Sequence, residues 1–334
     1  MKALILKRPC SIDGRPLSIA EVDTPIPGPK EILLKIMTCG ICHTDLHIVE
    51  GELKPKKLPI IPGHQIVGVV AAMGKRVTRF RKGDRVGVAW LNSTCGKCEF
   101  CQKEKENLCE KAKFTGYDVD GGYAEYAVVS ENFAYPIPRG FSEIEAAPLF
   151  CAGVIGFRAL RLSEVEKGER LGLFGFGASA HIVIQIAKHW GCQVFVFTRS
   201  EEHRKLAKEL GADWTGRAED TPPARLNSAV IFAPAGKLVL DALRVLNKGG
   251  TLALAGIYMT PIPELDYSKH LYYEKTVRSV ANSTRRDAED LLKLAAEIPI
   301  RTEVQEFDLN EANRALMLLK QGKIQGAGVL KVSQ

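Results

Sequence analysis

From residue 168 onward the chain alternates between short apolar runs and amphipathic stretches, with few residues between them. "RLGLFGFG" (170–177) has the composition of a strand, and "ASAHIVIQIAKHWG" (178–191) spaces its apolar residues as a helix does. The same pair recurs in "CQVFVFTRS" (192–200) and "EEHRKLAKELGA" (201–212), and the alternation continues to about residue 257. This pattern predicts an α/β domain with a doubly wound parallel sheet.

The turn between the first predicted strand and helix carries a glycine motif. Gly175, Gly177 and Ala180 spell G-x-G-x-x-A. The glycines let the backbone approach a pyrophosphate at the helix N-terminus, and the alanine allows close packing of helix and strand. A lone match to this motif is weak, but its place between a strand and a helix makes it a strong indication of dinucleotide binding.

The second predicted strand ends at Thr198, Arg199 and Ser200, which we expect to contact the cofactor. An NAD-binding site usually has a carboxylate there to hold the ribose 2′-hydroxyl. Here no carboxylate repels a 2′-phosphate and Arg199 is available to bind it, which favours NADP(H). The alternative is that Arg199 stacks on the adenine or points to solvent, which leaves NAD(H) usable.

The first third of the chain has a different character. Short β-like runs such as "EILLKIMTCG" (31–40) and "IVGVVAAMG" (66–74) are separated by proline and glycine, which predicts an irregular β domain. Near the C-terminus, residues 286–300 and 310–324 are amphipathic and predict two helices.

Length and composition limit the possible functions. The 334 residues suffice for two domains, and the net charge of +7 fits an anionic cofactor as well as it fits nucleic acid. No stretch approaches the roughly 20 apolar residues of a membrane span, and the N-terminal apolar run is too short for a signal peptide. We therefore expect a cytoplasmic protein without nucleic-acid or membrane partners, whose nine cysteines serve metal binding or catalysis rather than disulfides.

Four of these cysteines, Cys95, Cys98, Cys101 and Cys109, lie in "CGKCEFCQKEKENLC". Four thiolates on one loop suit tetrahedral zinc in a structural role, because no position is left for a substrate. The alternative is a pair of disulfides.

A catalytic zinc needs three protein ligands and one open position. The side chains that can serve are Cys39, Cys42, His43, His47, His64 and Cys151. The residues alone do not decide which of them bind.

These motifs together resemble the zinc-containing medium-chain alcohol dehydrogenases over essentially the whole chain. The resemblance rests on "GICHTDLH", "PGHQ", the four-cysteine loop, "PLFCAG" and "GFGASA". It implies a GroES-like catalytic domain formed by residues 1–151 and 283–334, and a Rossmann cofactor domain of residues 152–282. It also implies a homo-oligomer, a tetramer being favoured over a dimer.

The resemblance selects Cys42, His64 and Cys151 as ligands of the catalytic zinc and leaves Cys39 as a small semi-buried residue. With the zinc of the four-cysteine loop, two ions per chain are expected. Two thiolates and one imidazole leave a neutral zinc with a free position for an alcohol oxygen.

Thr44 and His47 resemble the family's proton relay, in which the hydroxyl takes the alcohol proton and the cofactor ribose passes it to the histidine. Three residues apart on a helical turn, they would face the same side. The alternative for His47 is a solvated surface position. His43 matches a position that contacts the cofactor pyrophosphate, and its alternative is also surface exposure.

Five further positions follow from the resemblance. Asp45 matches a carboxylate that orients the histidine ligand, with an Asx turn as the alternative. Gln65 stands where many members have a glutamate, and Ala327 where many have an arginine that contacts the cofactor. Trp90 and Leu53 match positions that line the substrate pocket, and Trp90 is otherwise an ordinary core residue.

The implied function is the reversible oxidation of primary, and in some cases secondary, alcohols to aldehydes or ketones by hydride transfer to a nicotinamide cofactor. The alternatives are a polyol- or threonine-type zinc dehydrogenase, a zinc-free quinone or enone reductase, and a non-catalytic NADP(H)-binding zinc protein. Polyol-type members usually have a carboxylate in place of the third cysteine ligand and lack the full quartet, and a zinc-free reductase has no use for the zinc ligands.

Overall fold

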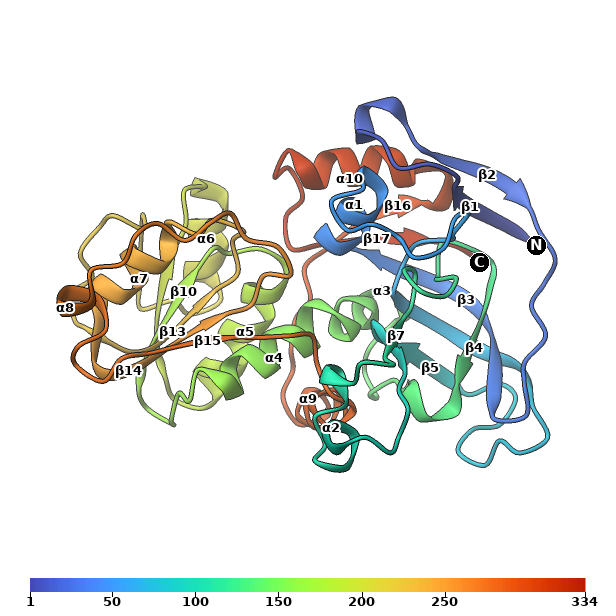
Figure 1. Ribbon diagram of the computed structural model, residues 1–334, viewed down its shortest axis with the longest axis horizontal. Coiled ribbons are helices and arrows are strands. Elements are labelled where there is room, and N and C mark those ends of the chain that lie inside the picture. Colours follow the sequence, from blue (N-terminus) through green and yellow to red (C-terminus); the bar gives the residue numbers. More distant parts are fainter. Residues whose placement is uncertain (334) are drawn as a thin grey trace. The chain divides into compact units, whose positions relative to one another are not determined.

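The computed structural model describes residues 1–333. The chain forms two compact units. The first comprises Met1–Cys151, Thr284–Glu297 and residues 302 onward, and the second comprises Ala152–Ser283 and Ile298–Arg301. Figure 1 shows the course of the chain through both.

The first unit is built on a seven-stranded sheet. Its strand order is β16-β17-β3-β4-β5-β9, with β8 paired to β3 off this path, and all pairs are antiparallel except β16 with β17. The strands are β3 (Glu31–Ile41), β4 (Gln65–Met73), β5 (Arg85–Val88), β8 (Tyr126–Ser130), β9 (Ala134–Pro136), β16 (Val304–Asp308) and β17 (Ala327–Lys331).

Smaller elements complete this unit. Two-stranded sheets join β1 (Lys2–Leu6) to β2 (Leu17–Glu21) and β6 (Leu91–Ser93) to β7 (Lys113–Phe114). The α-helices are α1 (His43–Glu50), α2 (Glu99–Gln102), α3 (Glu143–Ala146), α9 (Arg285–Glu297) and α10 (Ala312–Lys320). The 3₁₀ turns are Ile12–Gly14, Glu106–Leu108, Glu131–Phe133, Ala147–Phe150 and Leu309–Glu311.

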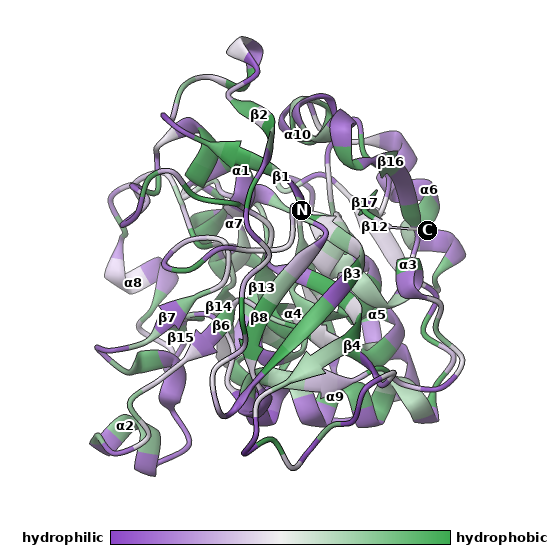
Figure 2. Cartoon of the chain, turned by 90° about the vertical axis from the view of Figure 1, so that its right-hand side faces the viewer, coloured by the Kyte–Doolittle hydropathy of each residue, from purple (hydrophilic) through white to green (hydrophobic). Residues whose placement is uncertain are grey.

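The sequence of strand β3 explains why this segment joins a sheet, and the end of the strand leads directly to the candidate site. Ile32, Leu34 and Ile36 are fully buried and alternate with partly exposed residues, the period-two pattern of a half-buried strand. The strands β3 and β8 are accordingly hydrophobic along much of their length (Figure 2). After Ile41 the chain leaves the strand, and α1 begins two residues later.

The second unit is a six-stranded parallel sheet with the order β12-β11-β10-β13-β14-β15. Its strands are β10 (Arg170–Phe174), β11 (Gln193–Phe197), β12 (Trp214–Gly216), β13 (Leu226–Ile231), β14 (Leu246–Leu254) and β15 (Thr276–Ser279). Its helices are α4 (Ala152–Leu162), α5 (Ala178–His189), α6 (Glu201–Glu209), α7 (Leu238–Val245) and α8 (Tyr267–His270). The predicted doubly wound parallel sheet is confirmed.

The winding of this sheet reverses at β10, because β11 lies on one side of it and β13 on the other. Ligands of doubly wound sheets bind at such a switch point, beyond the carboxyl ends of the strands. The glycine motif follows β10 directly, so the topology places it where a dinucleotide is expected.

Among the residues that the structure describes, no helix is both long enough and apolar enough to cross a membrane.

Candidate functional site

The structure brings Cys42, His64 and Cys151 together. The Cys42 Sγ atom lies 3.3 Å from His64 Nε2 and 4.0 Å from Cys151 Sγ, and the three ligand atoms all lie within 4.8 Å of one another. Zinc binds sulfur at about 2.3 Å and imidazole nitrogen at about 2.0 Å, so a tetrahedral ion separates such ligands by about 3.6–3.8 Å. The donor set and its spacing therefore fit zinc with three protein ligands.

Cys42 is held in place by the start of α1. It is the N-cap residue: its sulfur accepts from the Thr44 amide at 3.2 Å, and its own amide donates to Asp45 Oδ2 at 2.9 Å. This is a capping box in which cysteine stands for the usual serine or threonine. The helix cap thus fixes the backbone of the residue that offers the first thiolate.

Asp45 also holds the second ligand. Its other oxygen, Oδ1, accepts from His64 Nδ1 at 2.9 Å and from the Gly63 amide at 3.2 Å, and the side chain is fully buried. Because Nδ1 donates to Asp45, Nε2 faces Cys42 as a lone-pair donor. Asp45 combines the two roles considered for it, since it caps the helix and orients the histidine.

The charges of the site favour a cation between these ligands. Burial acts to raise the pKa of the Cys42 thiol, but hydrogen bonding with Cys151 and the charge of His64 hold that pKa well below its usual value. Burial likewise acts to lower the pKa of His64, but the charges of Asp45 and Cys42 raise it well above its usual value. The Cys42 sulfur and the Asp45 carboxyl group thus contact the two ring nitrogens of one imidazole.

Cys39 is separate from this group. It lies in β3, fully buried, and its thiol contacts the Gly40 carbonyl oxygen at 3.6 Å. Burial first, and then the charge of Asp45, raise the pKa of the Cys39 thiol well above its usual value. It is a neutral core residue in this structure.

The residue before His64 must be glycine. Gly63 has φ of 94°, and a Cβ atom there would lie 2.4 Å from the Tyr123 ring. Tyr123 is fully buried, and burial followed by the charge of Asp45 raises the pKa of its hydroxyl well above its usual value. Nothing in the sequence around Tyr123 marks this contact, because it joins segments 60 residues apart.

Thr44 and His47 are both buried in α1, with 7% and 8% of their surfaces exposed. A solvated surface histidine does not describe His47, whose Nδ1 atom contacts the carboxylate of Glu52. His43, at the first position of the helix, is exposed, and its ring centroid lies 6.2 Å from that of His47. Glu52 lies outside the motifs that the sequence contains.

The two expected pocket residues lie near these groups. Trp90 stacks on Phe114 with ring centroids 4.4 Å apart, and its ring lies 6.2 Å from that of His64. The buried Trp90 N–H has no acceptor among the described residues. Leu53 is partly buried against the core, and its amide donates to the His47 carbonyl oxygen at 3.0 Å.

The two positions that depart from the family pattern are both buried in strands. Gln65 is the first residue of β4 and is 2% exposed, and Ala327 is the first residue of β17 and is 4% exposed.

The four-cysteine loop forms a second cluster. Cys101 Sγ lies 3.9 Å from Cys95 Sγ and 3.5 Å from Cys98 Sγ, and Cys109 joins them within 4.8 Å. Backbone N–H groups of Lys97 and Cys98 lower the pKa of the Cys95 thiol to about 6. All nine cysteines are free thiols, so the disulfide alternative does not describe this loop. Four sulfur donors at these distances fit a closed zinc site.

The glycine motif has the conformation that dinucleotide binding needs. Gly175 has φ of 89°, and its amide donates to the Phe197 carbonyl oxygen at 2.8 Å. Gly177 is the N-cap of α5, and no heavy atom lies within 4 Å of where its Cβ would be. Ala180, in the first turn of α5, is fully buried. The open space at Gly177 lies where a phosphate would meet the first amides of α5.

The three residues after β11, numbers 198–200, differ in exposure and in their hydrogen-bond partners. Arg199 is exposed, whereas the Ser200 hydroxyl caps α6 by accepting from the His203 amide at 3.2 Å. The carbonyl oxygen of Thr198 accepts from Arg204 Nη1 at 3.2 Å. Arg204 also lines a hollow of about 590 Å³, with Lys205, Lys208 and Arg217 as its other cations. No sequence motif marks this hollow, although Arg204 and Lys208 are four residues apart on one helix face.

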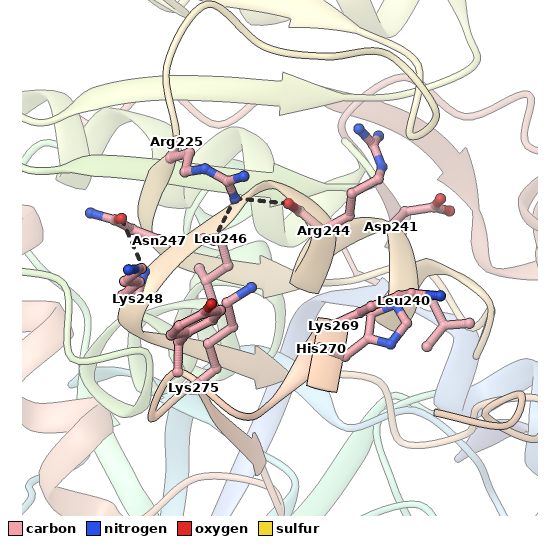
Figure 3. Close-up of a pocket in the computed structure, with 11 residues that line it drawn as sticks. Arg225, Leu240, Asp241, Arg244, Leu246, Asn247, Lys248, Lys269, His270 and Lys275 are labelled. Carbon is pink, nitrogen blue, oxygen red and sulfur yellow. Dashed lines mark hydrogen bonds between the residues drawn. The ribbon is translucent and has the colours of Figure 1, made fainter. Parts of the chain in front are cut away.

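A further hollow of about 430 Å³ lies in the same unit where α7 ends and β14 begins (Figure 3). Two of the cations that line it, Arg225 and Lys275, donate to backbone carbonyl oxygens. Arg225 Nη1 donates to the carbonyl oxygens of Arg244 and Leu246, and Lys275 Nζ donates to that of Leu243. Cations are stabilised at such a helix C-terminus, so these side chains serve to cap α7.

Two known families match successive parts of the chain. Residues 28–139 match the alcohol dehydrogenase GroES-like domain, and residues 180–297 match the zinc-binding dehydrogenase family. The chain is 46% identical to "Probable alcohol dehydrogenase AdhA" of Mycobacterium tuberculosis, over 99% of this chain and 97% of that protein. It is 37% identical to an alcohol dehydrogenase of Geobacillus stearothermophilus, over 95% and 97% respectively.

Solved structures agree with these relatives. A cinnamyl alcohol dehydrogenase from Sorghum bicolor has a TM-score of 0.90 and 28% identity, over 99% of this chain and 97% of that one. A cobalt- and zinc-bound alcohol dehydrogenase from Pyrobaculum aerophilum has a TM-score of 0.90 and 26% identity, over 99% of both chains. A Helicobacter pylori enzyme complexed with NADP(H) has a TM-score of 0.89 and 26% identity, over 99% of this chain and 97% of that one. The chain therefore belongs to the zinc-containing medium-chain alcohol dehydrogenase family.

Proposed function

We propose that this protein oxidises small alcohols reversibly to aldehydes or ketones, with zinc at Cys42, His64 and Cys151 and with NADP(H) favoured over NAD(H). The observation that carries the proposal is the three-ligand group, in which a buried carboxylate orients the histidine. Three ligands leave a position for substrate, which a purely structural zinc does not need.

The chemistry divides between bound groups and the chain. Zinc bound there would polarise the alcohol oxygen as a Lewis acid, and a bound nicotinamide cofactor would supply the hydride acceptor. Asp45 keeps the His64 ring oriented, and the Thr44 hydroxyl accepts the alcohol proton while its own proton passes on towards His47. The buried His47 then carries that proton away from the reacting oxygen.

We assign a second zinc to the four-cysteine loop, which gives two ions per chain.

Metal analysis combined with steady-state kinetics tests the whole proposal, using NADH and NADPH against a panel of small aldehydes. We expect two zinc ions and turnover with at least one cofactor. One zinc ion without turnover would instead indicate a non-catalytic NADP(H)-binding protein. Cys151 and the full quartet disfavour a polyol- or threonine-type enzyme.

Arg199 tests the cofactor preference. The exposed guanidinium after β11 is placed to pair with a 2′-phosphate that NAD(H) lacks. We expect Arg199→Ala to lower kcat/KM for NADPH by about tenfold, corresponding to the loss of about 1.4 kcal/mol, and to leave that for NADH nearly unchanged. Lys205→Ala, in the neighbouring hollow, is the matched control. An equal loss with both cofactors would contradict a role in choosing between them.

Leu53 tests the substrate pocket. Some ethanol-preferring relatives have tryptophan at this position, and leucine leaves more room. We therefore expect kcat/KM for butanol and benzyl alcohol to equal or exceed that for ethanol, and Leu53→Trp to lower the benzyl alcohol to ethanol ratio by about tenfold. If ethanol is the best substrate of the unaltered enzyme, the pocket argument is wrong.

We also propose that the protein is a homo-oligomer, with a tetramer favoured over a dimer. The edge strand β15 is exposed along its length, and large apolar or aromatic side chains are exposed in and before it. They include Tyr258, Tyr267, Tyr272 and Val277. An unpaired edge with such side chains is a usual place for association.

A cytoplasmic location is proposed because all nine thiols are free.

A further inference from the structure

We propose that Glu52 is a positioning residue of the proton relay, which holds the His47 ring and provides the path of its proton to water. This inference rests on the proposed alcohol dehydrogenase function. None of the sequence motifs includes Glu52, and the structure alone brings it to His47.

The turn after α1 creates the contact. The helix ends at Glu50, and Gly51 follows with φ of 84° in the left-handed region. The chain then folds back, because the Leu53 amide donates to the His47 carbonyl oxygen at 3.0 Å. Glu52 is held between these two fixed points, and its Oε2 atom accepts a hydrogen bond from His47 Nδ1.

The contact has a consequence for which ring nitrogen acts. With Nδ1–H donating to the carboxylate, Nε2 has the lone pair and accepts the proton that arrives from the alcohol. The Nδ1 proton passes along the hydrogen bond to Glu52, which releases it to water, so one proton enters the ring and one leaves. In aldehyde reduction both proton transfers run in reverse. In either direction, exchange with water then returns the His47 ring to the tautomer from which the next turnover starts.

Exposure gives the direction of the path. The His47 side chain is 10% exposed, whereas that of Glu52 is 47% exposed. A buried imidazole needs an acceptor that reaches solvent, and in this pair the carboxylate is the part in contact with water.

The other charged groups nearby leave this role to Glu52. The ring centroid of His43, on the same helix, lies 6.2 Å from that of His47. Glu50 accepts from Lys320 Nζ at 2.8 Å and from the Ile12 amide at 2.9 Å. Lys320, on α10, has its pKa raised by the hydrogen bond with Glu50 first, and the charges of Asp13 and Glu52 add to this. Glu50 is therefore a neighbouring carboxylate that is engaged elsewhere.

The test is kinetic. We expect Glu52→Gln to lower kcat for alcohol oxidation by about tenfold, with KM little changed, because proton release slows while substrate binding remains. Glu52→Ala should show the same loss, and added formate should restore much of kcat by replacing the missing carboxylate. Glu50→Gln, two residues earlier in the chain at a carboxylate that accepts from Lys320 and Ile12 instead, should keep kcat within about twofold.

The outcomes are distinguishable. Unchanged kcat in Glu52→Gln, or no response of Glu52→Ala to formate while the variant keeps its zinc and its fold, would overturn this inference. If His47→Gln lowers kcat and Glu52→Gln does not, the relay stands without Glu52. Absence of turnover in the unaltered enzyme would overturn the proposed function, and this inference with it.

Discussion

Cys42→Ala is expected to lower kcat/KM for alcohol oxidation by about 10³-fold or more and to reduce the zinc content from two ions per chain to one. The reason is that the substitution removes one of three ligands from a group whose atoms lie within 4.8 Å of one another. Without the ion, several kcal/mol of stabilisation of the developing alkoxide charge are lost. The measurements are metal analysis and steady-state kinetics on the same preparation.

Cys39→Ala is the matched control, three residues earlier in the chain. Cys39 is fully buried in β3, outside the three-ligand group, and behaves as a small apolar residue. We expect both zinc ions to remain and kcat/KM to stay within about threefold, at a cost of about 1 kcal/mol in unfolding free energy for the small cavity. Loss of one zinc ion in Cys39→Ala, or its retention in Cys42→Ala, would contradict the assignment.

The choice between these two cysteines shows what the residues alone leave open. Both lie in one short stretch, and composition gives no preference. The distinction comes from a change in local structure, because β3 ends at Ile41 and α1 begins at His43. Cys39 keeps a strand position facing the core, whereas Cys42 takes the cap of a helix, where its sulfur meets the Thr44 amide.

Local periodicity was sufficient to predict the parallel sheet of the second unit. Parallel strands that are buried on both faces appear in the sequence as continuous apolar runs, and β10 and β11 are buried at every position except the first. The glycine motif and the strand before it are neighbours in sequence, so their relation needs no knowledge of distant contacts. The fold class predicted from this periodicity, and the family and enzyme class implied by the motifs, are confirmed by the family matches and the relatives.

Contacts between distant segments were beyond such reasoning. Asp45 was expected to orient His64, but only through resemblance, since the two are 19 residues apart and in different elements. That the same carboxylate also caps α1 depends on the turn geometry at Cys42. Glu52 is close to His47 in sequence, yet its contact depends on the left-handed Gly51, which directs the chain back.

The four-cysteine loop should respond to mutation in a different way from the three-ligand group. Between Cys95 and Cys109 the chain forms only the four-residue helix α2 and one 3₁₀ turn, with little apolar core of its own. The loop meets α9 through Glu106, which is 2% exposed and accepts from the Arg285 amide at 2.9 Å and from its Nε at 3.2 Å. A buried carboxylate that loses these donors is costly, so order in the loop and docking on α9 depend on each other.

We therefore expect Cys101→Ala to lower the zinc content to one ion per chain and the Tm by about 10 °C or more, while kcat at 25 °C stays within about threefold. Zinc bound by four thiolates stabilises small loops by many kcal/mol, and at an unfolding entropy of about 2.1 cal/mol/K per residue each kcal/mol corresponds to about 1.5 °C in a chain of 334 residues. Cys10→Ala, at an exposed thiol outside both clusters, should change neither quantity. Calorimetry and metal analysis measure the effect, and an unchanged Tm with one zinc ion lost would show that the loop is ordered without its metal.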